Sequence, residues 1–174
     1  MRSDKDTGTG VASCQTALGW VGVAWSAEGL VTVTLPRSTE AEALEPLPIA
    51  TSASPAETPG LDVADLLEKL QRYYGGEQVT FGELLDPSIG TDFQRRVWGI
   101  TRSIPRGQTR TYGSVARETG SAGSARAVGQ AMAHNPWPPI VPCHRVVGHD
   151  GRLTGFGGGL EMKRQMLEFE REME

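Results

Sequence analysis

A cluster of three prolines between residues 135 and 139 limits the fold of this chain more than any other feature. The segment reads NPWPP, and a residue that precedes proline avoids the helical region of backbone conformation. The helical pattern before it, residues 121–136, must therefore end here, and the chain must leave in an extended connection. The apolar pair Ile140-Val141 follows, and we expect it to form a short buried strand that delivers Cys143 at its end.

Cys143 begins the part of the sequence with the most reactive side chains. It lies between Pro142 and His144, and a loop dense in glycine follows as far as Gly159. A thiol reacts as its thiolate, and an adjacent imidazole or cation lowers its pKa, so Cys143 is a candidate nucleophile. The alternative is a buried structural cysteine, which is the usual state of a lone thiol. A cysteine next to a histidine does not by itself decide between them.

The overall composition is that of a soluble globular protein, with 38% hydrophobic and 22% charged residues. No run of eighteen apolar residues is present, which argues against a transmembrane helix. The only other cysteine, Cys14, has no partners at metal-ligand spacing, so we expect no zinc site. The polar start MRSDKDTGTG does not resemble a signal peptide. We therefore expect a cytoplasmic protein without a disulfide.

Two short helices are expected in the segment that precedes the proline cluster. Residues 111–120 read TYGSVARETG, and residues 121–136 begin with serines that could cap a helix. Two short helices joined by a turn that contains glycine are typical of a helix-turn-helix, although any pair of antiparallel helices has this pattern. The second helix has small residues at Ala125, Ala127, Gly129, Ala131 and Ala133. They would allow close approach to a groove or, as an alternative, tight helix packing.

Charge is distributed unevenly along the chain. The net charge is −4, with a sequence pI of about 5.4. Residues 90–159 nevertheless carry nine arginines against three acidic residues, a net of +6, whereas the rest of the chain carries −10. This asymmetry indicates a basic lobe that faces an anionic partner. A compositional preference for arginine on a solvated surface is the alternative.

The remaining segments predict a small α/β unit followed by a helical one. We expect a tail over residues 1–17, a hairpin over 19–36, a loop over 37–60, a helix over 61–76 and a short strand over 78–84. Residues 86–90 look like a domain boundary, and Thr91 is placed to cap the first helix of the second domain. A last helix follows the glycine loop, with Leu160, Lys163, Leu167 and Glu170 on one stripe. Glu170 is then either a solvated helix end or a buried partner.

Four segments of the second half carry a resemblance to a known family. They are TYGSVA, SARAVGQAM, NPWPPIVPCHRVVG and GFGGGLEMKRQMLEFE, and they resemble the O6-alkylguanine-DNA alkyltransferases, also called methylated-DNA–protein-cysteine methyltransferases. The similarity runs in continuous register from Thr91 to Glu170, and residues before it match only in outline. It implies an RNase H-like α/β domain over residues 1–87, with a flexible loop at 37–60. A winged helix-turn-helix-like domain over residues 88–174 would carry the active site.

The resemblance also implies a chemical role for five residues. Such proteins move an alkyl group from O6 of guanine onto their own cysteine, here Cys143, and each molecule acts once. His144, a bound water and Glu170 would activate the thiol, and Asn135 would brace the turn that holds it. Tyr112 would help to rotate the 3′ phosphate and donate a hydrogen bond to the guanine, so that O6 need not leave as a bare anion. No cofactor and no metal are implied.

Further residues are implied at the DNA and at the base. The expected partner is double-stranded DNA that contains O6-alkylguanine, bound by a monomer that could cluster on DNA, with no role for a membrane. Arg126 would fill the stack after the damaged base swings out through the minor groove. The resemblance places these residues of the second short helix at the DNA: Ala125, Ala127, Gly129 and Gln130. It places these residues at the pocket for the base: Trp137, Pro138, Val146, Phe156, Gly157 and Gly158.

The chain departs from many relatives at Phe156, where they have tyrosine, so one hydrogen bond to the base is expected to be missing. Three other readings compete with alkyl transfer. A module that binds damage without transfer would lack a cysteine at position 143. A regulator on the same fold would carry a zinc-bearing sensor, which this sequence lacks. A cysteine hydrolase would need an oxyanion hole and repeated turnover.

Overall fold

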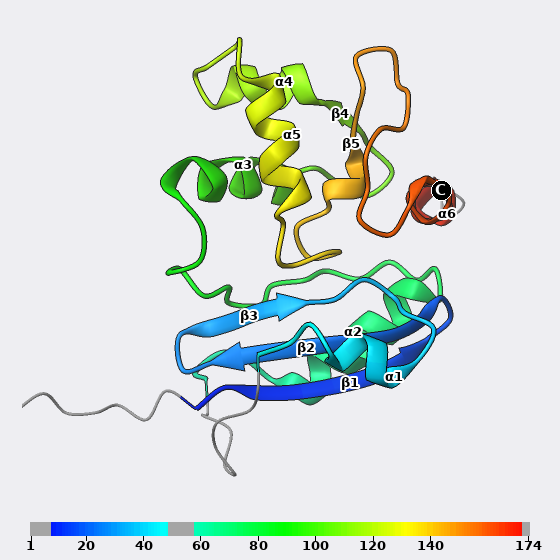
Figure 1. Cartoon of the computed structure of the whole chain (residues 1–174). Coiled ribbons are helices and arrows are strands. Elements are labelled where there is room, and N and C mark those ends of the chain that lie inside the picture. The colour runs from blue at the N-terminus through cyan, green and yellow to red at the C-terminus, as the bar shows by residue number, and fades with distance from the viewer. Residues whose placement is uncertain (1–7, 49–57, 172–174) are drawn as a thin grey trace, which may run out of the picture. The chain divides into compact units, whose positions relative to one another are not determined.

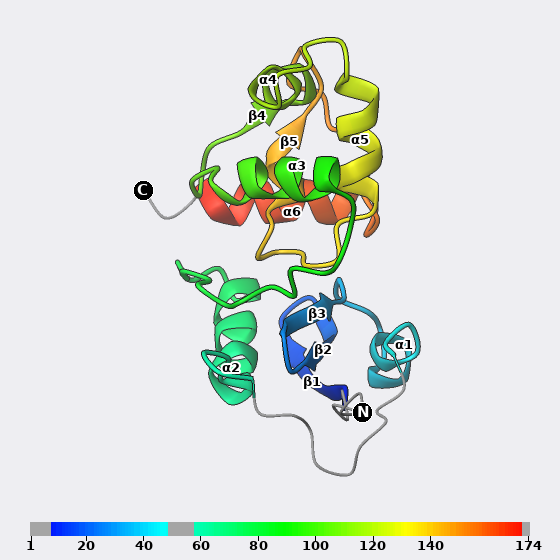
Figure 2. The same ribbon diagram turned by 90° about the vertical axis from the view of Figure 1, so that its left-hand side faces the viewer.

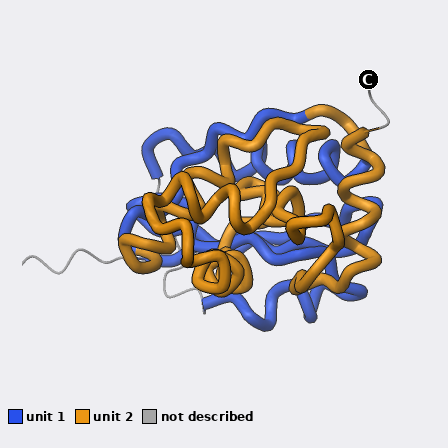
Figure 3. Tube along the Cα trace, turned by 90° about the horizontal axis from the view of Figure 1, so that it is seen from above, with its two compact units in different colours: residues 1–75, 79–88 blue, residues 76–78, 89–174 orange. Residues whose placement is uncertain are grey.

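The computed structural model describes residues 8–48 and 58–171. The chain is a mixed α/β protein that divides into two compact units (Figures 1 and 3). Unit 1 comprises residues 1–75 and 79–88, and unit 2 comprises residues 76–78 and 89–174. Over the described ranges, no helix is long and apolar enough to cross a membrane.

Unit 1 is built on a three-stranded antiparallel sheet in the order β1-β2-β3. The strands are β1 (Gly10–Thr16), β2 (Gly19–Ser26) and β3 (Gly29–Val33). The predicted hairpin over 19–36 is confirmed by the pairing of β2 with β3. The predicted tail was wrong for residues 10–16, which pair with β2 along the whole of β1. The residues of β1 show little alternation of apolar and polar side chains, so the strand is defined by its pairing with β2. Residues 1–7 of the predicted tail lie outside the described residues.

Two helices cover opposite faces of this sheet (Figure 2). Helix α1 (Glu40–Leu44) lies within the segment predicted as a loop, and a capping box at Thr39 starts it. Residues 49–57 of that segment lie outside the described residues. Helix α2 (Val63–Tyr74) confirms the predicted helix, and it buries Leu66, Leu70 and the two tyrosines at its end. Helix α1 packs closely on β2 at Gly22, where a Cβ would lie 2.5 Å from the carbonyl oxygen of Ala43.

The strand predicted over residues 78–84 does not form. Only Leu85 makes an isolated bridge, to Leu30 of β3. Glu83 instead turns inward and accepts a hydrogen bond from Lys69 of α2 at 2.8 Å. In this ion pair the Glu83 side chain is buried and the Lys69 side chain is 25% exposed.

Unit 2 consists mainly of helices around an apolar core. Helix α3 (Asp92–Arg102) starts at the capping box of Thr91, as predicted, and buries Val97 and Trp98. Helices α4 (Tyr112–Glu118) and α5 (Ala125–Ala133) pack on α3 and on each other. Ser124 precedes α5 without making a side-chain capping hydrogen bond, so the predicted serine cap was wrong.

The rest of unit 2 carries the proline cluster and the last helix. Ile140 and Val141 are buried but form a turn rather than the predicted strand. The turn closes because the Val141 N–H donates to the carbonyl of Trp137 at 2.9 Å. A 3-10 helix η1 (Cys143–Arg145) follows, then β5 (Val146–Val147), which pairs in parallel with β4 (Arg110–Thr111). Helix α6 (Leu160–Arg171) ends the described chain.

Candidate functional site

Cys143 lies at the start of η1, at the end of the turn that the prolines create. Its N–H donates to the carbonyl of Val141 at 2.8 Å. Asn135 braces the same turn from both ends of its amide. The side-chain nitrogen donates to the Val141 carbonyl at 2.8 Å, and the side-chain oxygen accepts from the N–H of Trp137 at 3.0 Å. The turn before the thiol is therefore held by one side chain that uses both its donor and its acceptor.

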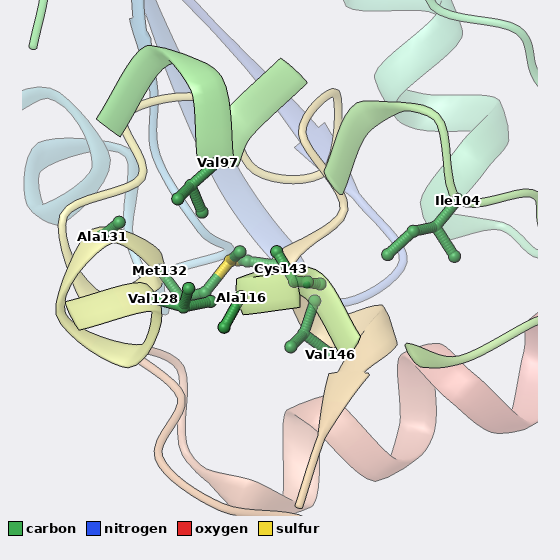
Figure 4. Close-up of a cluster of buried hydrophobic side chains, with 9 residues drawn as sticks. Val97, Ile104, Ala116, Val128, Ala131, Met132, Cys143 and Val146 are labelled. Atoms are coloured by element: carbon green, nitrogen blue, oxygen red, sulfur yellow. The ribbon is translucent and has the colours of Figure 1, made fainter. Parts of the chain in front are cut away.

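Cys143 is part of a buried apolar cluster in the core of unit 2 (Figure 4). The residue is 8% exposed. Tyr112 and Phe156 are partly buried and pack against the same cluster. The cluster comprises Val97, Ile104, Val115, Ala116, Val128, Ala131, Met132, Cys143 and Val146. The structure thus brings together the thiol, the start of α4 and the glycine loop, which are far apart in the sequence.

His144 is fully buried and contacts the last helix. Its Nε2 lies 2.8 Å from Oε1 of Glu170, whose side chain is also inaccessible to solvent. Burial would raise the pKa of Glu170, but hydrogen bonds from His144 and Arg145, and their charges, hold that pKa well below its usual range. Glu170 is thus a carboxylate that only accepts, so Nε2 of His144 carries the hydrogen. Burial lowers the pKa of His144, so the ring is neutral at neutral pH and Nδ1 bears a lone pair that can take a proton.

Lys163 is a buried cation that sequence reasoning did not assign to the site. Its Nζ donates to the carbonyls of Val146 at 2.8 Å and Thr154 at 2.9 Å, and it lies 5.9 Å from the ring centroid of Tyr112. Burial lowers its pKa to about 8, although the charge of Cys143 opposes this shift. The sequence does indicate its burial, because Lys163 shares the inward stripe of the last helix with Glu170, for which a buried role was considered. Leu160, predicted on that stripe, is 49% exposed.

The resting state of Cys143 is the thiol. Burial raises the pKa of Cys143, and this exceeds the opposing effects of the Asn135 side chain, the Lys163 charge and nearby backbone N–H groups. The sequence suggested that a neighbouring imidazole would lower this pKa. His144 does not, because its neutral ring carries no charge. The thiol therefore needs a base to react at neutral pH.

The residues predicted to contact DNA lie on α4 and α5. Tyr112 is the first residue of α4, directly after the Thr111 cap. Arg126, Ala127 and Gln130 are exposed on α5, and Ala125 and Gly129 are partly exposed. Apart from the backbone of α5 itself, a Cβ on Gly129 would meet no atom of the described residues within 4 Å. Ala131 does not belong to this small-residue face, because it is 2% exposed and packs in the core.

The residues predicted for the base pocket are divided between two places. Val146 and Phe156 join the cluster around Cys143. Trp137 is outside that cluster and packs edge-on against Trp98, with ring centroids 5.3 Å apart. Pro138 is buried, Gly157 is exposed and Gly158 is partly exposed. Within the described ranges, no group of three or more His, Cys, Asp or Glu side chains could hold a metal ion.

Known proteins with similar sequences belong to the family that the sequence motifs resemble. Residues 92–172 match the family model of the 6-O-methylguanine DNA methyltransferase DNA binding domain. The methylated-DNA–protein-cysteine methyltransferase of Mycobacterium tuberculosis is 51% identical over 105 residues, which cover 60% of this chain and 63% of that protein. The Shigella flexneri protein of the same name is 44% identical over 105 residues, covering 60% of this chain and 61% of its own. The matched region thus spans less than two thirds of these relatives.

Solved structures extend the similarity over nearly the whole chain. The crystal structure of Mycobacterium tuberculosis O6-methylguanine methyltransferase superposes with a TM-score of 0.75 at 35% identity, covering 95% of this chain and 94% of the other. A structure of the Mycobacterium tuberculosis protein in complex with DNA superposes with a TM-score of 0.74 at 35% identity, covering 93% and 92%. A protein from the archaeon Pyrococcus kodakaraensis, 24% identical with a TM-score of 0.67, shares the fold.

Proposed function

The chain belongs to the 6-O-methylguanine DNA methyltransferase family, and from this premise we propose that it repairs DNA by moving the alkyl group of O6-alkylguanine onto Cys143. The observation that carries the proposal is a buried thiol next to a neutral histidine, whose Nε2–H is held 2.8 Å from a buried carboxylate. A nucleophile beside an oriented base is the arrangement that activates a thiol. The related Mycobacterium tuberculosis structure in complex with DNA supports DNA as the partner.

The proposed reaction is a single displacement at the alkyl carbon. The S–H bond of Cys143 breaks, and the proton passes through water to His144, whose positive charge Glu170 stabilises. The thiolate forms a bond to the alkyl carbon as the bond from that carbon to O6 breaks, and the released electron pair stays on guanine. The hydroxyl of Tyr112 donates a hydrogen bond to the guanine as this electron pair arrives, and the proton that left Cys143 returns from His144 through water to the guanine, so that it does not leave as an anion.

Lys163 and the product state explain why each molecule would act once. Lys163 supplies a buried positive charge that favours the thiolate as it forms. The product is a thioether, and no residue of the site is placed to hydrolyse a carbon–sulfur bond. Transfer is thus stoichiometric with protein, and the reaction is that of a methylated-DNA–protein-cysteine S-methyltransferase.

DNA would be bound through α4 and α5, as a winged helix-turn-helix. We assign Arg126, which is exposed near the start of α5, to the space that the flipped base leaves. Flipping costs a few kcal/mol, and an inserted side chain offsets part of that cost. The small residues Ala127 and Gly129 would let α5 approach the minor groove.

The finer architecture belongs to the same proposal. We assign residues 1–87 to an RNase H-like domain and residues 88–174 to the domain that carries the site. The protein would act in the cytoplasm as a monomer, with the alkylated base held between Phe156 and the cysteine turn. Since Trp137 packs on Trp98, its contribution to the pocket would be to support the turn rather than to touch the base.

One experiment tests the proposed function directly. The protein is incubated with duplex DNA that contains O6-methylguanine, and its intact mass is measured. We expect one methyl group on Cys143 and no reaction beyond one equivalent. Cys143→Ser should abolish transfer. The matched control is Cys14→Ser, which removes a buried thiol of unit 1 and should leave transfer intact. Burial raises the pKa of the Cys14 thiol to about 11. Repeated turnover would indicate a hydrolase, and binding without a mass change would indicate a damage-recognition module.

A further inference from the structure

Arg145 makes contacts that go beyond holding a loop in place. Its Nε donates to Oε2 of Glu170 at 3.0 Å, and a terminal nitrogen donates to Oε1 at 2.7 Å. The other terminal nitrogen donates to the carbonyl of Ile104 at 2.6 Å. The guanidinium therefore grips both oxygens of one carboxylate while it is anchored to the backbone after α3. A planar fork of this kind fixes the orientation of a carboxylate, which a lysine cannot do.

The carboxylate that Arg145 holds is also the partner of the histidine. Oε1 of Glu170 accepts from both Arg145 and Nε2 of His144. The side chains of His144 and Glu170 are inaccessible to solvent, and that of Arg145 is 12% exposed. In this setting the Glu170 carboxylate raises the pKa of His144, and the charge of Arg145 acts in the opposite direction.

We propose that Arg145 is a positioning residue of the transfer reaction, which keeps Glu170 ionised and aimed at Nε2 so that His144 stays neutral and ready to accept a proton. This inference rests on the proposed function for its consequence, but not for the state of His144 that it describes.

The charged groups around His144 explain why the arginine is needed. Helix α6 presents Glu170 and Lys163 to the ring, and η1 itself carries Cys143 and Arg145. Without Arg145, Glu170 would be a buried anion whose nearest partner is the imidazole. A buried anion draws a proton onto an adjacent base, and an imidazolium cannot take the proton of the Cys143 thiol.

The test measures the protonation of His144 in the whole chain, by nitrogen-15 NMR of its imidazole as the pH is varied. In the unchanged protein, we expect Nε2 to carry the hydrogen and Nδ1 to be bare at neutral pH. In Arg145→Gln, the midpoint for protonation of His144 should rise by about 1 to 3 pH units. Arg145→Lys keeps the charge but not the fork, so its midpoint should rise by less.

Arg106 offers a matched structural control in the same unit. It donates to the backbone carbonyls of Gly76, Glu77 and Phe169, so it ties down the same end of α6 without touching the carboxylate of Glu170. Arg106→Gln should leave the midpoint of His144 unchanged. If Arg145→Gln does not fold, Arg145→Lys decides the question by the same measurement.

Transfer rates supply the second readout, measured with free O6-benzylguanine so that DNA binding does not contribute. At any pH below its His144 midpoint, Arg145→Gln should react about tenfold more slowly for each pH unit of the difference. Its transfer rate should recover as the pH is raised above that midpoint. A rate that is lowered equally at every pH, with an unchanged His144 midpoint, would show that Arg145 is only structural. If the unchanged protein takes up no alkyl group, the proposed function fails, while the NMR result still decides the role of Arg145.

Discussion

At the scale of single residues, unit 2 is defined by titratable side chains inside an apolar core. His144 and Lys163 have no exposed surface, and Glu170 is 2% exposed. Burying a charge is costly unless it is paired and hydrogen-bonded, and the charged Lys163 and Glu170 meet that condition through carbonyls, Arg145 and His144. Such clusters are found at functional sites more often than in purely structural cores. The cluster supports the view that Cys143 is a nucleophile rather than a structural thiol.

The same residues predict that unit 2 loses stability in acid. The pKa of His144 lies below 6.5 in the folded chain, and that of Glu170 lies below 4.5. Both shifts are downward, so the unfolded chain binds more protons as pH falls. The free energy of unfolding should therefore decrease, first as pH drops through 6.5 and again as it drops through 4.5.

Urea unfolding across this pH range measures the effect. Phenylalanine in place of Trp20 and Trp25 removes the unit 1 signal, so that fluorescence reports on Trp98 and Trp137. Glu170→Gln should lose the step near pH 4.5 although its stability at neutral pH is lower. A free energy of unfolding that is constant or rises between about pH 7 and about pH 4 contradicts the expected sign.

At the scale of elements, α5 has a composition that its own packing does not require. Val128, Ala131 and Met132 bury one side of the helix. Gly129 lies at the flank of that side and is partly exposed, and a Cβ there would find open space. Glycine inside a helix costs about 0.5–1 kcal/mol relative to alanine. Gly99 of α3 carries the same cost, so a glycine in open space does not by itself mark an interface. The proposal that α5 approaches DNA makes Gly129 the position where an added Cβ would interfere.

This cost predicts opposite effects of one substitution on stability and on function. Gly129→Ala should raise the melting temperature, since it stabilises α5 by about 0.5–1 kcal/mol. It should slow transfer from duplex DNA about tenfold or more, because an added methyl group costs roughly 1–3 kcal/mol in a close interface. Transfer from free O6-benzylguanine should be unchanged.

Gly99 of α3 is the matched control for that experiment. It is exposed, lies inside a helix, and has no neighbour within 4 Å of a built Cβ. Gly99→Ala should stabilise unit 2 to a similar extent without affecting either substrate. If Gly129→Ala behaves in the same way as Gly99→Ala toward duplex DNA, α5 does not enter a groove.

The elements that the sequence predicted well are those with strong local signals. The cap at Thr91 and the helix that became α2 are visible in a few consecutive residues, and both are confirmed. Strand β1 and the inward turn of Glu83 depend on partners far along the chain, so local patterns missed them. The turn at Ile140 and Val141 is apolar like a strand, but the hydrogen bonds of Asn135 close it. Lys163 was missed because a lysine on an inward stripe only makes sense once its two carbonyl partners are known.

At the scale of the whole molecule, charge is separated along the chain. Residues 90–159 carry a net of +6, and the remaining residues carry −10. A protein with a net charge of −4 would be repelled by DNA if its charge were spread evenly. Concentration of arginine in the segment that holds α3, α4 and α5 gives that segment a field of its own. Association with DNA would then depend on this local field rather than on the total charge.

This separation predicts a strong dependence on salt. A protein that neutralises several phosphates releases counterions, so its affinity for duplex DNA falls steeply as salt rises. Between about 50 mM and about 200 mM salt, the dissociation constant for a duplex should rise at least about tenfold, even for a small number of phosphate contacts. It is measured by fluorescence anisotropy with the Cys143→Ser protein, so that transfer does not consume the complex. The rate of transfer from free O6-benzylguanine to the unchanged protein should vary little over the same range, since the buried pair His144–Glu170 is shielded from salt. A duplex affinity that does not change with salt would mean that these arginines are a solvated surface, and the basic segment would then not be the DNA-binding one.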